Sequence, residues 1–106
     1  MYTIYDRILN LRSTRGHTGP VTGLSFEPNN GKLLASCSSD MSAKIWNCEN
    51  YNCMKTLRGH DHSISSVIFM IPSCDFVMTC SRDQTMKYWE ISSGYCNRTF
   101  SGAHTD

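Results

Sequence analysis

The sequence predicts an all-β chain built from two four-stranded antiparallel sheets, preceded by one strand of a further sheet. Three observations support this fold class. The sequence repeats itself without a gap at a period of 43 residues. Each copy holds four short segments with the alternating or continuous apolar pattern of β-strands, and none with a helical period. Clusters of turn-forming residues separate these segments.

The repeat runs from Arg15 to Leu57 and again from Arg58 to Phe100. A match that needs no gap and retains both Gly-His pairs and both tryptophans is not expected by chance. We therefore divide the chain into repeats at 15–57 and 58–100. Residues 1–14 are then expected to end a preceding unit with its outer strand, and residues 101–106 to begin a further one. Identical pairs include Gly16/Gly59, His17/His60, Cys37/Cys80, Ser38/Ser81, Asp40/Asp83, Lys44/Lys87 and Trp46/Trp89.

Each repeat is expected to fold as one small sheet. Four short strands per repeat, repeated along the chain, are typical of the blades of a β-propeller, in which neighbouring sheets stack around an axis. The chain would then form two blades of an incomplete propeller. The expected strands are residues 21–26, 33–37, 43–48 and 53–57 in the first repeat and 64–69, 76–80, 86–91 and 95–100 in the second.

Composition narrows the class of protein. Ten Lys and Arg residues against nine Asp and Glu leave a net charge of +1, and the two signs are interspersed. We therefore expect no nucleic-acid partner, which a clustered basic surface would indicate. No apolar stretch is long enough to span a bilayer, so we also expect no membrane insertion. The polar start of the chain does not resemble a signal peptide, and a cytoplasmic location is predicted.

A Gly-His pair, then Ser-x-Ser-x-Asp, then Lys-x-Trp recur at the spacing of the WD repeat, and the chain resembles that family over both copies. The resemblance implies a propeller that binds partner proteins. It also implies a buried chain of hydrogen bonds in each repeat that fixes the fold. Its members would be His17, Asp40, Trp46 and either Ser36 or Ser38 in the first repeat, and His60, Asp83, Trp89 and either Thr79 or Ser81 in the second.

Other chemistry was weighed against this interpretation. Ser, His and Asp also make hydrolase triads, but the chain has no Gly-x-Ser-x-Gly motif, and its His and Asp recur in both repeats. We therefore predict no enzyme activity, no cofactor and no metal ion. Three residues without metal-ligand spacing are interpreted as exposed loop residues: His62, His104 and Cys74. Four cysteines at matching strand positions are expected to act as small buried apolar residues: Cys37, Cys80, Cys53 and Cys96.

Four segments are more particular than the general repeat: 31–46, 59–67, 81–85 and 93–96. They resemble the lissencephaly-1 family, whose members regulate cytoplasmic dynein in nuclear migration and centrosome positioning. The resemblance implies a cytoskeletal location and two kinds of partner, the dynein motor and the catalytic subunits of platelet-activating-factor acetylhydrolase. It also places Arg82, in a Ser-Arg-Asp turn, on the surface that meets dynein. The alternatives are a product without independent function, or part of another scaffold such as a ubiquitin-ligase substrate receptor or a G-protein β-like protein.

Two sheets have four faces, and a single contact between them covers only two. The remaining faces are expected to carry apolar residues such as Leu33, Phe76 and Met78. A patch of that size is rarely tolerated by a soluble monomer. We therefore expect the isolated chain to be oligomeric, aggregated or without fixed packing.

Overall fold

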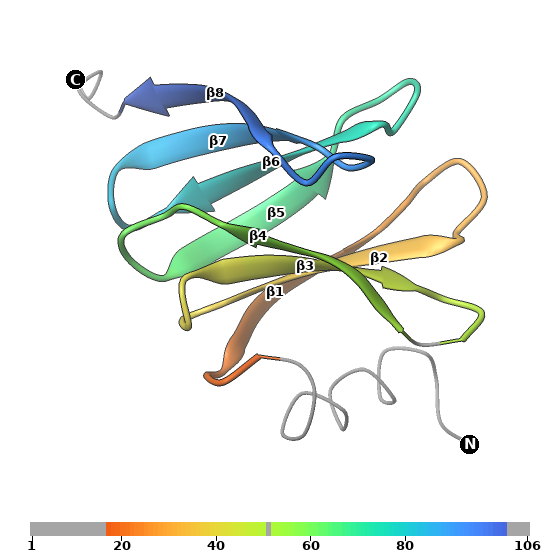
Figure 1. Ribbon diagram of the computed structural model, residues 1–106, viewed down its shortest axis with the longest axis horizontal. Helices are drawn as coiled ribbons and strands as arrows, with labels where there is room; N and C mark the ends of the chain where they lie inside the picture. The colour runs from red at the N-terminus through yellow and green to blue at the C-terminus, as the bar shows by residue number, and fades with distance from the viewer. Residues whose placement is uncertain (1–16, 51, 102–106) are drawn as a thin grey trace.

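A computed structural model describes residues 17–50 and 52–101. Within these residues there are two four-stranded antiparallel sheets and no helix, which confirms the predicted fold class (Figure 1). The strand expected within residues 1–14 lies outside the described residues. The first sheet consists of β1 (Val21–Phe26), β2 (Leu33–Ser38), β3 (Ser42–Asn47) and β4 (Cys53–Arg58), and the second of β5 (Ile64–Phe69), β6 (Phe76–Ser81), β7 (Thr85–Glu90) and β8 (Cys96–Ser101).

The strands pair in sequence order within each sheet, and all begin and end within one residue of the predicted bounds. The two sheets also share their irregularities. The pairing shifts at Ile45/Trp46 in the first sheet and at Tyr88/Trp89 in the second. Such bulges bend a strand and increase its twist. The 43-residue repeat therefore extends from the sequence to the details of the backbone.

Two matching turns in each sheet have a residue with a left-handed backbone. Met41 and Gln84, which directly follow the repeated aspartates, have φ angles of 73° and 70°. Gly31 and Cys74 occupy the other pair of matching positions, with φ angles of 69° and 61°. Only glycine adopts this region without steric cost. The turns between the first two and the middle two strands are thus built alike in both repeats.

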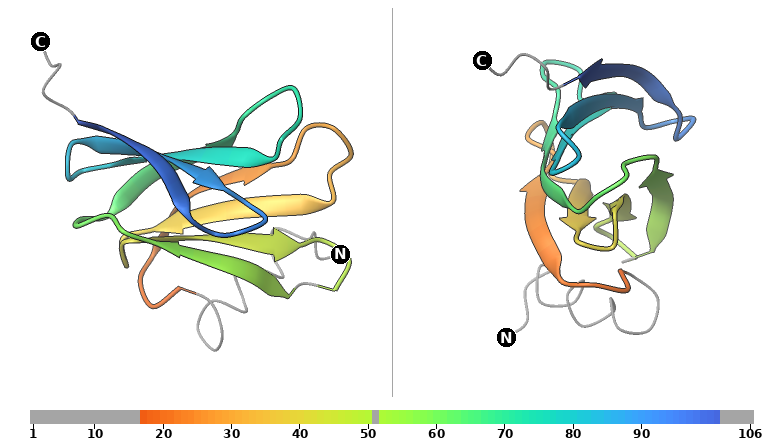
Figure 2. Two further views of the ribbon diagram at one scale, coloured as in Figure 1. Left: turned by 45° about the horizontal axis from the view of Figure 1, so that its top comes forward. Right: turned by 90° about the vertical axis from the view of Figure 1, so that its left-hand side faces the viewer.

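The two sheets stack with their first strands side by side. In Figure 2, β1 and β5 lie next to each other, whereas the outermost strands β4 and β8 lie apart, as in neighbouring blades. Because side chains alternate along a strand, each sheet has a side that carries the tryptophan, here called the tryptophan face, and an opposite face. The opposite face of the first sheet packs on the tryptophan face of the second.

This contact contains the main core. The first sheet contributes small and medium side chains and the second sheet larger ones, so that the sheets approach closely. Leu33 packs against the edge of this core, so its predicted position on a bare face was wrong; Phe76 and Met78 are partly exposed, as expected. The contributors are Ala35, Cys37, Ala43, Ile45 and Leu57 from the first repeat and Ile64, Val67, Phe69, Cys74, Val77, Trp89 and Ile91 from the second.

The cysteines do not all follow the prediction. Cys37 is buried in the main core, as expected, but Cys53 and Cys80 are only partly buried and Cys96 is exposed. Cys80 is less buried than its counterpart Cys37 because the second sheet has no described neighbour on its opposite face. Cys53 and Cys96 lie on the outermost strands β4 and β8, beside the tryptophans and away from the main core. Cys74 was expected to be an exposed loop residue and is instead buried.

Candidate functional site

Four residues of the second repeat that match positions in the first form one continuous chain of hydrogen bonds. Nδ1 of His60, which precedes β5, donates to the Asp83 carboxylate at 3.0 Å. Nε2 of the same ring lies 2.6 Å from Oγ1 of Thr79 on β6. That hydroxyl oxygen also accepts a bond of 2.9 Å from the indole N–H of Trp89 on β7. The chain thus joins the loop before β5, two strands and one turn.

The first repeat has the same arrangement. His17 Nδ1 donates to Asp40 at 3.0 Å, and His17 Nε2 lies 2.7 Å from Ser36 Oγ. The indole N–H of Trp46 donates to the same Ser36 oxygen at 2.8 Å. Because a carboxylate can only accept, Nδ1 carries the proton in both histidines, and the hydroxyl donates to a neutral Nε2.

The sequence left two candidates open in each second strand, and the structure separates them. Ser36 and Thr79 bridge the histidine and the tryptophan. Ser38 instead donates to the backbone carbonyl group of Pro20 at 2.9 Å, and Ser81 does the same to that of Ser63, also at 2.9 Å. These second hydroxyl groups therefore tie the middle turn of each sheet to the loop before its first strand.

Two members of the network were missed in the sequence. Ser42 and Thr85 each donate from both the hydroxyl group and the backbone N–H to the aspartate two residues earlier. Their hydroxyl oxygens also lie 3.2 Å and 3.1 Å from Nδ1 of the nearest histidine. The signal was present, because both repeats place a hydroxyl residue two positions after the aspartate, which is typical of an Asx-turn.

Gly59, the glycine of the second Gly-His pair, has a steric reason to be glycine. A Cβ atom added at Gly59 would lie 3.2 Å from the ring of Trp89. The backbone before His60 thus passes directly over the indole ring, and a larger residue would push the two apart. Glycine lets the loop place the histidine within reach of Thr79.

The aspartates are held as anions. Burial alone would raise the pKa of Asp40, but hydrogen bonds from Ser42 and from the Thr18 backbone, together with His17, lower that pKa from 3.8 to about 2. At Asp83, burial is likewise outweighed by bonds from Thr85, Asp61 and His60, and the pKa falls well below its ordinary value. Hydrogen bonds to the charged form account for both shifts.

These shifts predict that acid destabilises the fold. A carboxyl group with a lowered pKa in the folded state stabilises the protein above its unfolded pKa, and the contribution is lost as the pH falls toward the folded value. We expect the free energy of unfolding to fall between about pH 4 and pH 2, because the fold lowers the pKa of Asp40 from its ordinary value of 3.8 to about 2. Urea unfolding at several pH values and one chain concentration measures this. The double variant Asp40→Asn, Asp83→Asn should be less stable at pH 6, and its stability should fall less in acid. If the free energy of unfolding falls equally with pH in the parent and the double variant, these two carboxylates do not cause the acid sensitivity.

The network is closed to a substrate. Ser36 and Thr79 are fully buried, and both histidines are buried at the level of the core. No buried side-chain nitrogen or oxygen atom in the described residues lacks a hydrogen-bond partner. A nucleophile must reach its substrate, and these hydroxyl groups cannot. The arrangement is therefore suited to holding the strands and turns of each sheet in one geometry rather than to reacting with a substrate.

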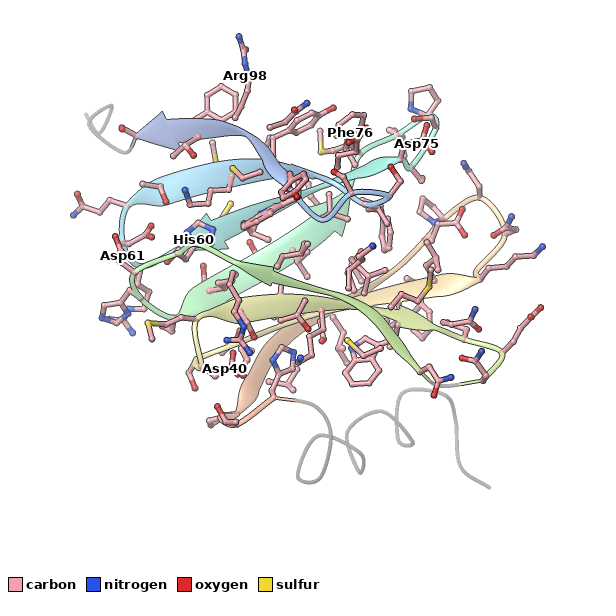
Figure 3. All side chains as sticks on the ribbon, viewed as in Figure 1. Asp40, His60, Asp61, Asp75, Phe76 and Arg98 are labelled. Carbon is pink, nitrogen blue, oxygen red and sulfur yellow. The ribbon has the colours of Figure 1, made fainter. Side chains whose placement is uncertain are left out.

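Arg82 lies at the end of the sheets where both histidine networks end. Its backbone N–H donates to the carbonyl group of Ser63 at 3.0 Å, which holds the turn between β6 and β7 against the loop before β5. Its side chain is exposed. The labelled residues Asp40, His60 and Asp61 mark this end in Figure 3, and Asp75 and Phe76 mark the other.

A second polar feature occupies the other end. The buried Glu27 carboxylate accepts backbone N–H bonds from Asn29 at 3.1 Å and Lys32 at 3.2 Å, which closes the turn between β1 and β2. A cavity of about 360 Å³ lies here between the turns of the two sheets, and Cys74 lines it. The second repeat has Met70 at the position matching Glu27, so the repeat pattern gave no signal for this turn.

The geometry agrees with the comparison to known families. The family described as WD domain, G-beta repeat, matches residues 9–47 and 51–90, which is more than half of the chain. The chain belongs to the WD-repeat family. Each matched WD repeat contains one of the two histidine networks, and repeats of this kind form scaffolds that bind other proteins.

Individual relatives match over shorter stretches of one or two WD repeats. The nuclear distribution protein PAC1-1 of Uncinocarpus reesii is 48% identical over 43% of this chain, and nudF 1 of Talaromyces marneffei is 44% identical over 54%. The RbAp48-related protein prw1 of Schizosaccharomyces pombe is 39% identical over 39%. The chain spans 11%, 13% and 10% of the length of these three relatives.

The part of the chain that the structure describes contains no helix with the length and apolar character needed to cross a bilayer.

Proposed function

We propose that the chain is a protein-interaction module of a dynein regulator of the lissencephaly-1 type, acting in microtubule-based nuclear migration. Its partners would be the dynein motor and the catalytic subunits of platelet-activating-factor acetylhydrolase. The division into repeats at 15–57 and 58–100, flanked by parts of neighbouring units at 1–14 and 101–106, belongs to this proposal. So does a cytoplasmic, cytoskeletal location.

The exposed Arg82 carries the proposal. The matching position in the first repeat is Ser39, so the turn does not need arginine to fold. The backbone of the turn is held by Asp83 and Ser63, which leaves the guanidinium group with no structural duty that the described contacts show. A guanidinium group in a fixed turn is suited to bind carboxylates of a partner, singly or bidentately.

The relatives support the same function. Two of the three relatives described above are named nuclear distribution proteins, and their matches cover 43% and 54% of this chain. Nuclear distribution is the process that the lissencephaly-1 resemblance implies. Because the match covers only about a tenth of each relative, their names alone do not carry the proposal.

The first functional prediction is that Arg82→Glu weakens binding to the dynein motor domain. Reversing the charge removes a hydrogen-bonding cation and adds repulsion against acidic groups. We expect a loss of about 2–5 kcal/mol where the contact is buried, or mainly slower association where it lies at the interface rim. Surface-immobilised motor domain and a concentration series of the chain measure both rates, and the thermal midpoint should remain unchanged.

Lys32→Glu is the matched control, because this exposed lysine lies in a turn at the other end of the sheets. It should bind like the parent. If folded Arg82→Glu binds as tightly and as fast as the parent, Arg82 is not part of the surface. If the parent itself does not bind the motor domain, the dynein assignment fails and a WD-repeat scaffold of another system takes its place, as the similarity to prw1 allows.

A further inference from the structure

The turn between β1 and β2 contains a pair of residues that occurs nowhere else in the sequence. Asn30 precedes Gly31, and no other asparagine of the chain is followed by a glycine. Both residues are exposed. The second repeat has Ser73 and Cys74 at the matching positions, so a sheet of this kind folds without an Asn-Gly pair in this turn.

The side chain of Asn30 is held against the peptide group that follows it. Its Oδ1 atom accepts the backbone N–H of Lys32 at 3.2 Å, which makes an Asx-turn. The ring closed by this hydrogen bond contains both the side-chain amide carbon of Asn30 and the backbone nitrogen of Gly31. The Lys32 N–H also stabilises negative charge on Oδ1, which develops when a nucleophile attacks that carbon. The turn therefore prepares this carbon for attack by the neighbouring nitrogen.

Gly31 leaves its backbone nitrogen open to reaction. Its φ angle is 69°, and a Cβ atom added here would have no other atom within 4 Å, so neither a side chain nor a neighbour covers the residue. Its N–H donates to the backbone carbonyl group of Glu27 at 3.0 Å, and this bond has to open first. Exposed turns open locally at a low cost in free energy.

We propose that Asn30 is a site of spontaneous deamidation. The Gly31 nitrogen loses its proton and forms a bond to the side-chain amide carbon of Asn30. The bond from that carbon to the side-chain nitrogen breaks, and the nitrogen takes up a proton and leaves as ammonia. Water then opens the cyclic imide. Opening at the side-chain carbonyl carbon gives aspartate, and opening at the backbone carbonyl carbon gives isoaspartate. Asparagine is among the thermolabile residues of proteins.

Both products disturb the hydrogen bonds that close this turn. The buried Glu27 carboxylate accepts the backbone N–H of Asn30 at 3.3 Å, so an aspartate at position 30 sets a second negative charge near it. Isoaspartate lengthens the main chain by one CH2 group. This moves the N–H groups of Gly31 and Lys32 away from their acceptors on Glu27.

The same turn joins the two repeats. The side chain of Asn29 donates to the backbone carbonyl group of Pro72 at 2.8 Å, in the turn between β5 and β6. These two turns lie side by side at one end of the sheets (Figure 2). A changed main chain at residue 30 displaces its neighbour Asn29, so deamidation loosens this end of the contact between the sheets.

Asn47 and Asn50 provide controls within the same chain. The Oδ1 atom of each accepts the backbone N–H two residues later, at 2.7 Å and 2.9 Å, so both also form Asx-turns. The residues that follow them are Cys48 and Tyr51. A side chain at the following residue hinders attack by its nitrogen, so these asparagines should persist where Asn30 is converted.

Incubation of the folded chain at neutral pH and body temperature tests the proposal. Mass spectrometry of peptides should show Asn30 converted several times faster than Asn47 and Asn50. Methyl transfer by a protein isoaspartate methyltransferase should detect isoaspartate in the aged chain. The thermal midpoint should fall as the converted fraction rises. Asn30→Ser, which takes the residue of the matching turn, should accept no methyl groups and keep its midpoint over the same incubation.

Two further samples complete the test. Fresh Asn30→Asp shows the effect of the added charge alone, and its midpoint should lie between those of the fresh and the fully converted parent. A parent sample in urea shows how the Asn-Gly pair reacts without the turn. The proposal is overturned if Asn30 in the folded chain is converted no faster than Asn47 and Asn50, or only in urea. Conversion that leaves the midpoint unchanged overturns the link to the contact between the sheets.

Discussion

Replacing Asp83 with alanine is expected to destabilise the chain by about 2–4 kcal/mol. The carboxylate accepts bonds from His60, from the Asp61 backbone and from two groups of Thr85. Its loss leaves the buried His60 donor without its main acceptor, and each stranded buried group costs about 1–3 kcal/mol. Urea unfolding at one chain concentration measures the change.

Asp75→Ala is the matched control for this prediction. Asp75 is an exposed loop residue at the other end of the sheets, and only its backbone is hydrogen-bonded in the described contacts. A change there is expected to remain within about 0.5 kcal/mol. If both variants lose the same free energy of unfolding, the hydrogen bonds around Asp83 do not stabilise the fold.

A larger effect is expected from Trp89→Ala, about 3–5 kcal/mol. The indole ring is almost fully buried in the main core between the sheets, and its N–H is the donor that completes the bonding of Thr79. Truncation leaves a cavity in the contact that joins the two sheets. The unfolding transition should also become less cooperative, because the second sheet loses much of its apolar contact with the first.

Trp89→Phe separates the two contributions of the tryptophan. It retains most of the ring volume but removes the N–H donor to Thr79. We expect a loss of about 1–2 kcal/mol, well below that of the alanine variant. If both substitutions are equally harmful, then the hydrogen bond rather than the packing dominates, and the account of the core is wrong.

Much of this architecture could be predicted from the sequence because the repeat compares each residue with a partner 43 positions away. The strands and the members of each network occupy matching positions, so the two copies support each other. The choice between Ser36 and Ser38 could not be made in this way. Both lie on the same face of one strand, and only the distances to the histidine and the tryptophan separate them.

The wrong predictions of burial have a common physical cause. Leu33 and Cys80 were misplaced because burial depends on which sheet lies next to a given face, and the repeat carries no information on that neighbour. Cys74 was misjudged because a turn between two stacked sheets can be buried even when turns in general are exposed. Ser42 and Thr85 were overlooked although the pattern was present in both copies.

The exchange of the two indole N–H protons with solvent is the most direct test of the central claim that each sheet is fixed by its own buried network. In a proton–nitrogen correlation spectrum after transfer to heavy water, the Trp46 and Trp89 signals should both persist long after those of exposed amides. Asp83→Asn should accelerate exchange at Trp89 much more than at Trp46, because the networks share no residue. If both indole signals vanish with the exposed amides, or if Asp83→Asn affects them equally, the networks do not exist as described.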